Sequence, residues 1–152
     1  MMKLQNNSVA VTINPQTVAT NGTATGLAVD TLGADELDIV VSAISATTSA
    51  VPDTVVIQHA DVTNTSSFAA ITGGTFTTAT SGYPTQVTNA TASTTPFAKI
   101  NVNWLGKKRY VRVLTTASTN GAYYVSADVR LARQEVSKSG TSLGAAFVTN
   151  VA

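Results

Sequence analysis

The sequence predicts an all-β domain in which antiparallel sheets pack face to face as a β-sandwich. Val and Thr are abundant while only two Glu are present, and β-branched side chains favour a pleated sheet over a helix. Several short runs alternate apolar with polar residues, the pattern of half-buried strands. Gly and Pro separate these runs, as in a sandwich or a barrel. With no helix expected, the layer that covers one sheet is a second sheet.

The first part of the chain alternates weakly at Val9, Val11 and Ile13. We interpret residues 1–20 as an N-terminal arm or a first strand, with the strand ending near Pro15. Clear alternation predicts strands at 36–45 and 54–62. Short strand candidates are 25–30 and 68–72, with two more near 75–80 and 85–92 in a weakly patterned region.

Residues 97–133 contain three alternating runs, which turn residues separate. Ile100, Val102 and Trp104 share a face of the first run, so Trp104 is expected in the core. The Asn120–Gly121 pair before the third run tolerates positive φ and favours a tight hairpin. We therefore expect residues 97–133 to form a three-stranded antiparallel meander.

The 152-residue chain is long enough for one domain, which we place at residues 21–135. Residues 62–98 contain no charged side chain and only a weak pattern, so we interpret them as a long loop region. Residues 136–152 are interpreted as a loose C-terminal tail. No apolar run approaches the roughly 18 residues of a membrane span, so no membrane is expected among the partners.

Opposite charges occupy opposite parts of the chain. Residues 1–61 carry one base and six acids, while residues 99–138 carry eight bases and two acids. The net charge is only +1, so no overall field attracts nucleic acid. We expect the two parts to attract each other, either within one fold or between copies.

No residue pattern indicates catalysis or a cofactor. His59, which shares a strand face with Asp61, is the only histidine and the chain has no Cys, so a metal ligand set is lacking. The acidic group Asp35, Glu36 and Asp38 does not have the spacing of an EF-hand loop. Without a nucleophile elbow, P-loop or dinucleotide fingerprint, we expect a protein that is not an enzyme and holds no metal or cofactor.

A basic cluster follows the first run of the expected meander. Its cations lie beside Trp104 and Tyr110, as in a nucleic-acid patch, but solvated charges are also ordinary at a turn. We favour contact with an acidic protein surface over nucleic acid. The candidate protein-contact residues are Val9, Val11, Ile13, Lys107, Lys108, Arg109 and Arg112.

Residues 25–133 resemble a family of small β-rich phage proteins. The residues that carry the likeness are Val29–Gly33, Val56–Asp61, Phe68–Gly73, Lys108–Val113 and Arg130–Arg133. They resemble the head decoration, cement or capsid-stabilising proteins of tailed bacteriophages, which are encoded near the major capsid gene.

The resemblance implies a sandwich of jelly-roll, Ig-like or β-tulip type with loose terminal arms. It also implies a non-catalytic virion protein that binds the major capsid protein on the outer surface of the head. A homo-oligomer is implied, with a trimer favoured. We further expect residues 1–20 to add a strand to the capsid or to a neighbouring copy. The alternative is a carbohydrate- or receptor-binding module of a virion fibre or spike, with Tyr83, Tyr124 and Trp104 stacking on sugars.

Overall fold

The predicted β-sandwich is confirmed by the computed structural model, which describes residues 8–45, 51–83, 97–117, 121–132 and 148–151. The first sheet has the strand order β1 (Ser8–Val18), β9 (Tyr123–Ala132), β4 (Glu36–Ser45), β7 (Ala98–Asn103) and β10 (Val148–Val151). The second sheet has the order β2 (Thr23–Thr25), β8 (Tyr110–Ala117), β5 (Pro52–Ala60) and β6 (Ala69–Thr77), with β3 (Val29–Asp30) also paired to β8.

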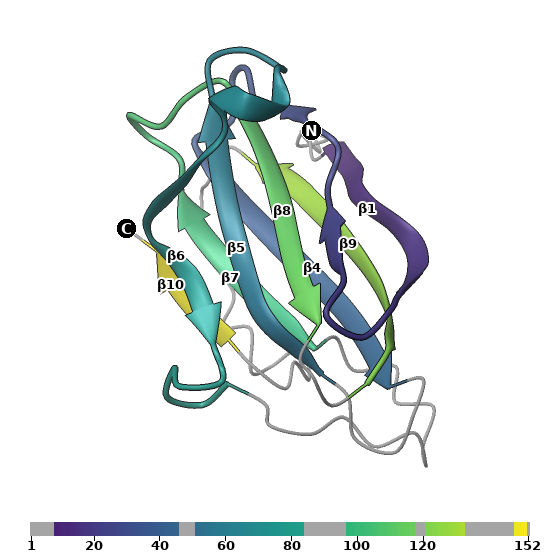
Figure 1. Ribbon diagram of the computed structural model, residues 1–152. Coiled ribbons are helices and arrows are strands. Elements are labelled where there is room, and N and C mark those ends of the chain that lie inside the picture. The colour runs from purple at the N-terminus through teal and green to yellow at the C-terminus, as the bar shows by residue number, and fades with distance from the viewer. Residues whose placement is uncertain (1–7, 46–50, 84–96, 118–120, 133–147, 152) are drawn as a thin grey trace, which may run out of the picture.

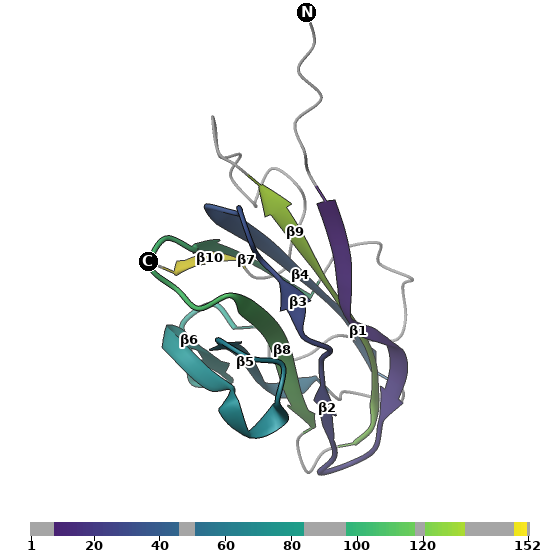
Figure 2. The same ribbon diagram turned by 90° about the horizontal axis from the view of Figure 1, so that it is seen from above.

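The two sheets lie as two layers (Figures 1 and 2). Among the described strands, every pair is antiparallel except β10 with β7. The described residues contain no α-helix, and their one helical element is the 3-10 turn η1 (Thr65–Ser67).

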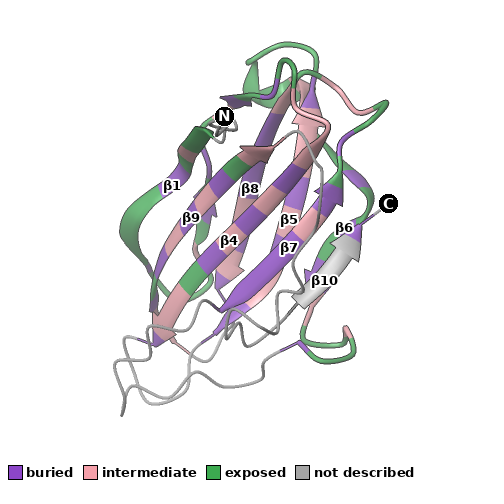
Figure 3. Cartoon of the chain, turned by 180° about the vertical axis from the view of Figure 1, so that it is seen from behind, coloured by how far each residue is buried: buried purple, intermediate pink, exposed green. Residues whose placement is uncertain are grey.

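The core lies between the two layers, and alternate residues of the strands build most of it. In β4, the middle strand of the first sheet, Leu37, Ile39 and Val41 are buried, whereas Asp38 and Val40 are only partly covered. Figure 3 shows this alternation along β4 as purple and pink bands. Each fully buried Leu, Ile or Val contributes roughly 1.5–3 kcal/mol. The second sheet buries a matching set, which includes Val55, Ile57, Val111 and Val113.

The expected meander at residues 97–133 is wrong. β7 and β9 both pair with β4 in the first sheet, while β8 pairs with β5 in the second. The chain therefore crosses between layers on either side of β8, and no hairpin joins β8 to β9. Alternation was a poor guide here because strands of both layers turn one face to the same core. Asn120 lies outside the described residues.

The described part of each terminal segment is a strand at an edge of the first sheet, rather than a loose arm. β1 continues beyond Pro15 to Val18, with register shifts between Val11 and Ile13 and between Ile13 and Gln16. Pro15 is tolerated there because an edge strand need not donate on its outer side. At the other edge, β10 runs parallel to β7. Residues 1–7, 133–147 and 152 are not among the residues that the structure describes.

The segment expected to be a long loop, residues 62–98, contains a full strand. β6 runs through Gly73–Gly74, so the two short strands expected at 68–72 and 75–80 are one. Gly73 has a φ of 73°, and the register with β5 shifts between Val56 and Gln58. This is the irregular pairing that a glycine in a bulge permits. The strand expected at 85–92 falls in residues 84–96, which the structure does not describe.

Candidate protein-docking surfaces

The acidic and basic parts of the chain attract each other within one fold. Every ion pair among the described residues joins an acid from residues 1–61 to a base from residues 99–138. These pairs are Asp38–Lys99 at 3.0 Å, Asp61–Lys108 at 3.5 Å and Asp30–Arg109 at 2.7 Å. The charge asymmetry of the sequence is therefore partly used inside the molecule.

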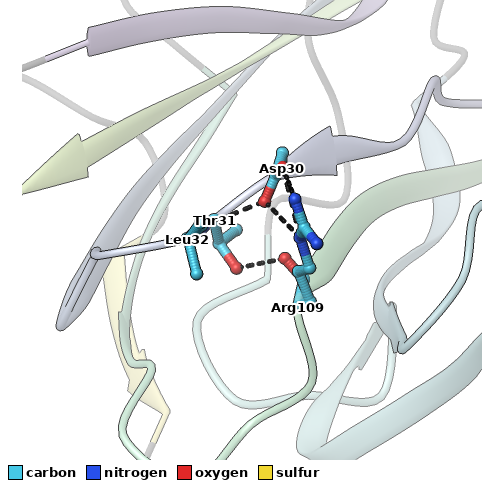
Figure 4. Close-up of polar contacts among 4 residues, drawn as sticks. All are labelled: Asp30, Thr31, Leu32 and Arg109. Carbon is cyan, nitrogen blue, oxygen red and sulfur yellow. Dashed lines mark hydrogen bonds and ion pairs between the residues drawn. The ribbon is translucent and has the colours of Figure 1, made fainter.

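Arg109 makes a two-pronged contact with Asp30 at the molecular surface. Its Nε donates to Asp30 Oδ1 at 3.1 Å, and its Nη2 donates to Oδ2 at 2.7 Å (Figure 4). The pKa of Asp30 is lowered, mainly by these hydrogen bonds and next by the Leu32 N–H that Asp30 also accepts. The carboxylate thus stays ionised to a lower pH than an isolated Asp side chain does.

Replacing Arg109 with Gln is expected to raise the pKa of Asp30, because the main group that stabilises the carboxylate is removed. A lowered folded-state pKa stabilises the fold above the unfolded value, and this part of the stability is lost as pH falls through the folded value. The variant should therefore show a smaller loss of stability in acid. NMR titration of the Asp30 carboxyl carbon measures the pKa, with Lys108→Gln as the control. An unchanged Asp30 pKa would contradict this assignment.

Arg112, a predicted contact residue, is buried rather than available to a partner. Its guanidinium stacks on the Phe68 ring, with Cζ 4.2 Å from the centroid. Nε donates to Gln58 Oε1 at 2.7 Å, and Nη2 donates to the Thr65 carbonyl at 3.3 Å. Arg112 therefore fastens the connection between β5 and β6 to the second sheet.

The contacts of His59 are those of a structural residue. Its ring packs edge-on against Trp104 with centroids 6.4 Å apart, and its Nδ1 accepts the Lys108 N–H at 3.4 Å. Burial lowers the pKa of His59, and the charges of Lys108 and Lys107 lower it further. Among the described residues, no group of three metal-ligating side chains is found.

The aromatic residues considered for sugar stacking are mostly inside. Trp104 is buried as predicted, and Tyr83 is also buried, with its hydroxyl donating to the Pro52 carbonyl at 2.7 Å. Tyr83 also packs edge-on against Phe97 at 5.3 Å. Tyr124 alone of the three is exposed, and one exposed ring is a weak basis for a sugar-stacking platform.

The edge strand β1 presents two of its three predicted contact residues. Val9 is 62% and Val11 is 45% exposed, whereas Ile13 is 1% exposed and belongs to the core. The register explains the difference, because Val11 opposes Asp128 and Ile13 opposes Ala127, so Thr12 is an extra residue. Such a bulge moves the following side chain to the opposite face. Ile13 is therefore not available to a partner.

Among the described residues, the backbone on the outer side of β1 is hydrogen-bonded at one point, Thr12. Leu27 N donates to the Thr12 carbonyl at 2.6 Å, and Thr12 Oγ1 donates to the Leu27 carbonyl at 2.9 Å. Gly26 is required here, because a Cβ would collide with Thr12 Oγ1 and the Val113 carbonyl. The exposed residues Val9 and Val11 precede this closure.

A second exposed apolar feature was missed in the sequence and consists of two similar turns. Leu32 and Leu105 each occupy the second position of a four-residue turn, which the bonds Ala34 N to Thr31 O (2.9 Å) and Lys107 N to Trp104 O (3.0 Å) close. Gly33 and Gly106 follow the leucines with φ of 84° and 75°. Positive φ at the third position is typical of a type II turn. We call residues 31–34 and 104–107 the paired leucine turns.

The same type of side-chain to backbone hydrogen bond stabilises each turn. The N–H of Leu32 donates to Asp30 Oδ1 at 3.0 Å, and the N–H of Leu105 donates to Asn103 Oδ1 at 3.1 Å. Each is the bond of an Asp or Asn side chain to the backbone two residues on. The signal was present in the sequence as Asp30-Thr-Leu-Gly and Asn103-Trp-Leu-Gly.

Hydrogen bonds join one turn to the other. Trp104 Nε1 donates to Thr31 Oγ1 at 2.7 Å, and the Thr31 hydroxyl donates to the Arg109 carbonyl. The Thr31 N–H donates to the same carbonyl at 2.9 Å, and the Trp104 N–H donates to the Asp35 carbonyl at 2.9 Å. The paired leucine turns therefore form one unit, although more than seventy residues separate them in the chain.

No protein-family model, curated protein or solved structure matches this chain. Within the described residues, no helix has the length and apolar character needed to cross a membrane.

Proposed function

We propose that this protein is a structural virion protein that binds the outside of a phage capsid and stabilises the shell. The resemblance of residues 25–133 to phage head decoration proteins supports the proposal. The structural observation that favours it most is the exposed edge strand β1 with Val9 and Val11. An edge strand can extend a sheet of another protein, with main-chain bonds for affinity and alternate side chains for specificity.

The proposed partner is the major capsid protein, and the proposed location is the outer surface of the head. Shell stabilisation works through many copies, each with a modest contact, and linked contacts reinforce one another. We propose a homo-oligomer for the same reason, with a trimer favoured. The proposal assigns no catalytic role to any residue.

Purified protein mixed with phage shells that lack it is expected to pellet with the shells and to saturate at a fixed ratio to capsomers or three-fold sites. Changing Val9 and Val11 together to Asp should weaken binding at least tenfold, about 1.4 kcal/mol, because charges replace the apolar contact. Tyr124→Asp, an exposed position on the outer face of the same sheet, is the control. Absence of wild-type protein from the pellet would reject shell binding.

If the wild type and the double variant pellet equally well, shell binding stands and the role of β1 is rejected. A chemical unfolding curve of each variant shows that the altered proteins are folded. These substitutions are preferable to deletion of residues 1–17, because deletion would also remove Ile13 from the core.

A further inference from the structure

We propose that the paired leucine turns are a contact surface between copies of this chain. Leu32 and Leu105 are the two most exposed large apolar side chains among the described residues, at 79% and 66%. Single exposed leucines are unremarkable, but these two stand on one hydrogen-bonded unit. Val62, also exposed, lies on the connection beside it, where Asp61 pairs with Lys108.

The three connections that carry these side chains lie at one end of the sandwich. The register places Asp30 and Ala60 opposite Tyr110, and Glu36 opposite Asn103. Residues 31–35, 61–68 and 104–109 therefore emerge together at the upper end in Figure 1.

The turns hold the leucines in place before any partner arrives. Each leucine N–H and each turn-closing N–H already has an acceptor, and the Trp104–Thr31 bond fixes one turn against the other. A preorganised surface loses little conformational entropy on association, so more of the apolar contact becomes affinity. Neither leucine side chain packs in the core. Their exposure at the tips of the turns therefore does not stabilise the isolated molecule.

The charges at this end favour a second copy over a polyanion. Four acids and three bases lie accessible on or beside the three connections, namely Asp30, Asp35, Glu36 and Asp61 with Lys107, Lys108 and Arg109. The net charge of this surface is 3 − 4 = −1, so it offers no positive field that would steer nucleic acid towards it. Interspersed charges of both signs are, however, complementary to the same pattern on another copy.

The end of the sandwich that carries the three connections is about as large as one side of a standard protein interface. The three connections are five, eight and six residues long, close to the roughly 20–30 residues that each side of a standard interface contributes. An interface of about 800 Å² per partner would cover about a tenth of the 8327 Å² surface of the chain.

The contact surface rests on the homo-oligomer of the proposed function, and sedimentation equilibrium of the full chain tests both without any shell, so the outcome is separate from that of capsid binding. At about 100 µM, a contact with a Kd of about 10 µM is largely formed, and the wild type is expected to be oligomeric. Leu32→Ser with Leu105→Ser should weaken self-association at least tenfold. Leu27→Ser changes an exposed leucine outside the turns and should leave it unchanged. A monomeric wild type, or a double variant as associated as the wild type, would overturn the proposal.

Crosslinking gives a second readout that keeps the turns intact. The chain has no Cys, so the single variant Leu105→Cys carries one thiol at the turn and Leu27→Cys carries one elsewhere. A short bis-maleimide should link Leu105→Cys copies into dimers at least tenfold faster than Leu27→Cys copies. Equal rates would reject the contact even if the serine variants fail to fold.

Discussion

Replacing Lys99 with Met is expected to lower the free energy of unfolding by about 3 kcal/mol, because it leaves the Asp38 carboxylate without its cation. The Lys99 side chain is only 6% exposed, and its Nζ lies 3.0 Å from Asp38 Oδ2. The Asp38 side chain is 24% exposed, so water replaces part of the lost interaction. The expected loss of stability is therefore at the lower end of the range for breaking a buried ion pair. Among the described residues, Asp38 Oδ1 is buried without a hydrogen-bond partner.

The double variant Asp38→Leu with Lys99→Met separates the contribution of the ion pair from the contribution of side-chain packing. Removing both charges should recover most of the lost stability, because an apolar pair of similar volume often equals a buried ion pair. Urea denaturation of the wild type, the single variant and the double variant measures these differences. A single variant within about 0.5 kcal/mol of the wild type, the range of ordinary surface changes, would show that the pair contributes little.

Thr31→Val is expected to destabilise the fold by about 2–4 kcal/mol, because it leaves the buried Trp104 Nε1–H and the Arg109 carbonyl each short of one partner. An unsatisfied buried donor or acceptor costs roughly 1–3 kcal/mol. The volume of the side chain hardly changes, so the lost hydroxyl dominates the effect. Thermal or urea unfolding gives the magnitude, and the indole N–H resonance of the only Trp reports on the lost bond.

Thr31→Ser keeps the hydroxyl and is the matched control. It should remain within about 1 kcal/mol of the wild type, since only a methyl group is removed. If Val and Ser are equally destabilising, the hydroxyl does not join the paired leucine turns. The Val variant should also self-associate more weakly, because the two turns are no longer fixed to each other.

The fold class and the inward faces of most strands were predictable from residue pattern alone. Leu37, Ile39 and Val41 alternate with partly covered residues as expected, and Trp104 is buried with its neighbours on the same face. Period-two alternation reports which side of a strand meets the core. It does not report which sheet the strand joins, so the pairing of β7, β8 and β9 could not be predicted in this way.

The contact residues were harder to predict because single irregularities decide exposure. Val9, Val11 and Ile13 would share a face in a regular strand, but the extra residue at Thr12 sends Ile13 into the core. Arg112 belongs to a run of basic residues, but its side chain is buried because it stacks on Phe68 and donates to Gln58. Neither a bulge nor a distant stacking partner is visible in the local sequence.

The paired leucine turns show a different limit. Each Asx-x-Leu-Gly segment by itself indicates only a turn, and such segments are common between strands. Their importance comes from the Trp104–Thr31 bond, which depends on β3 and β7 ending at the same end of the sandwich. The local pattern was thus readable from sequence, whereas the surface that it builds depends on the strand order.

A cryo-electron reconstruction of phage shells incubated with the protein tests capsid binding most directly. The proposal predicts sandwich-shaped density on the outer surface of the shell, with the β1 edge and Val9 and Val11 against the major capsid protein. Density that places another face of the sandwich against the shell would contradict the role of β1. A shell surface identical with and without the protein would contradict the proposed function itself.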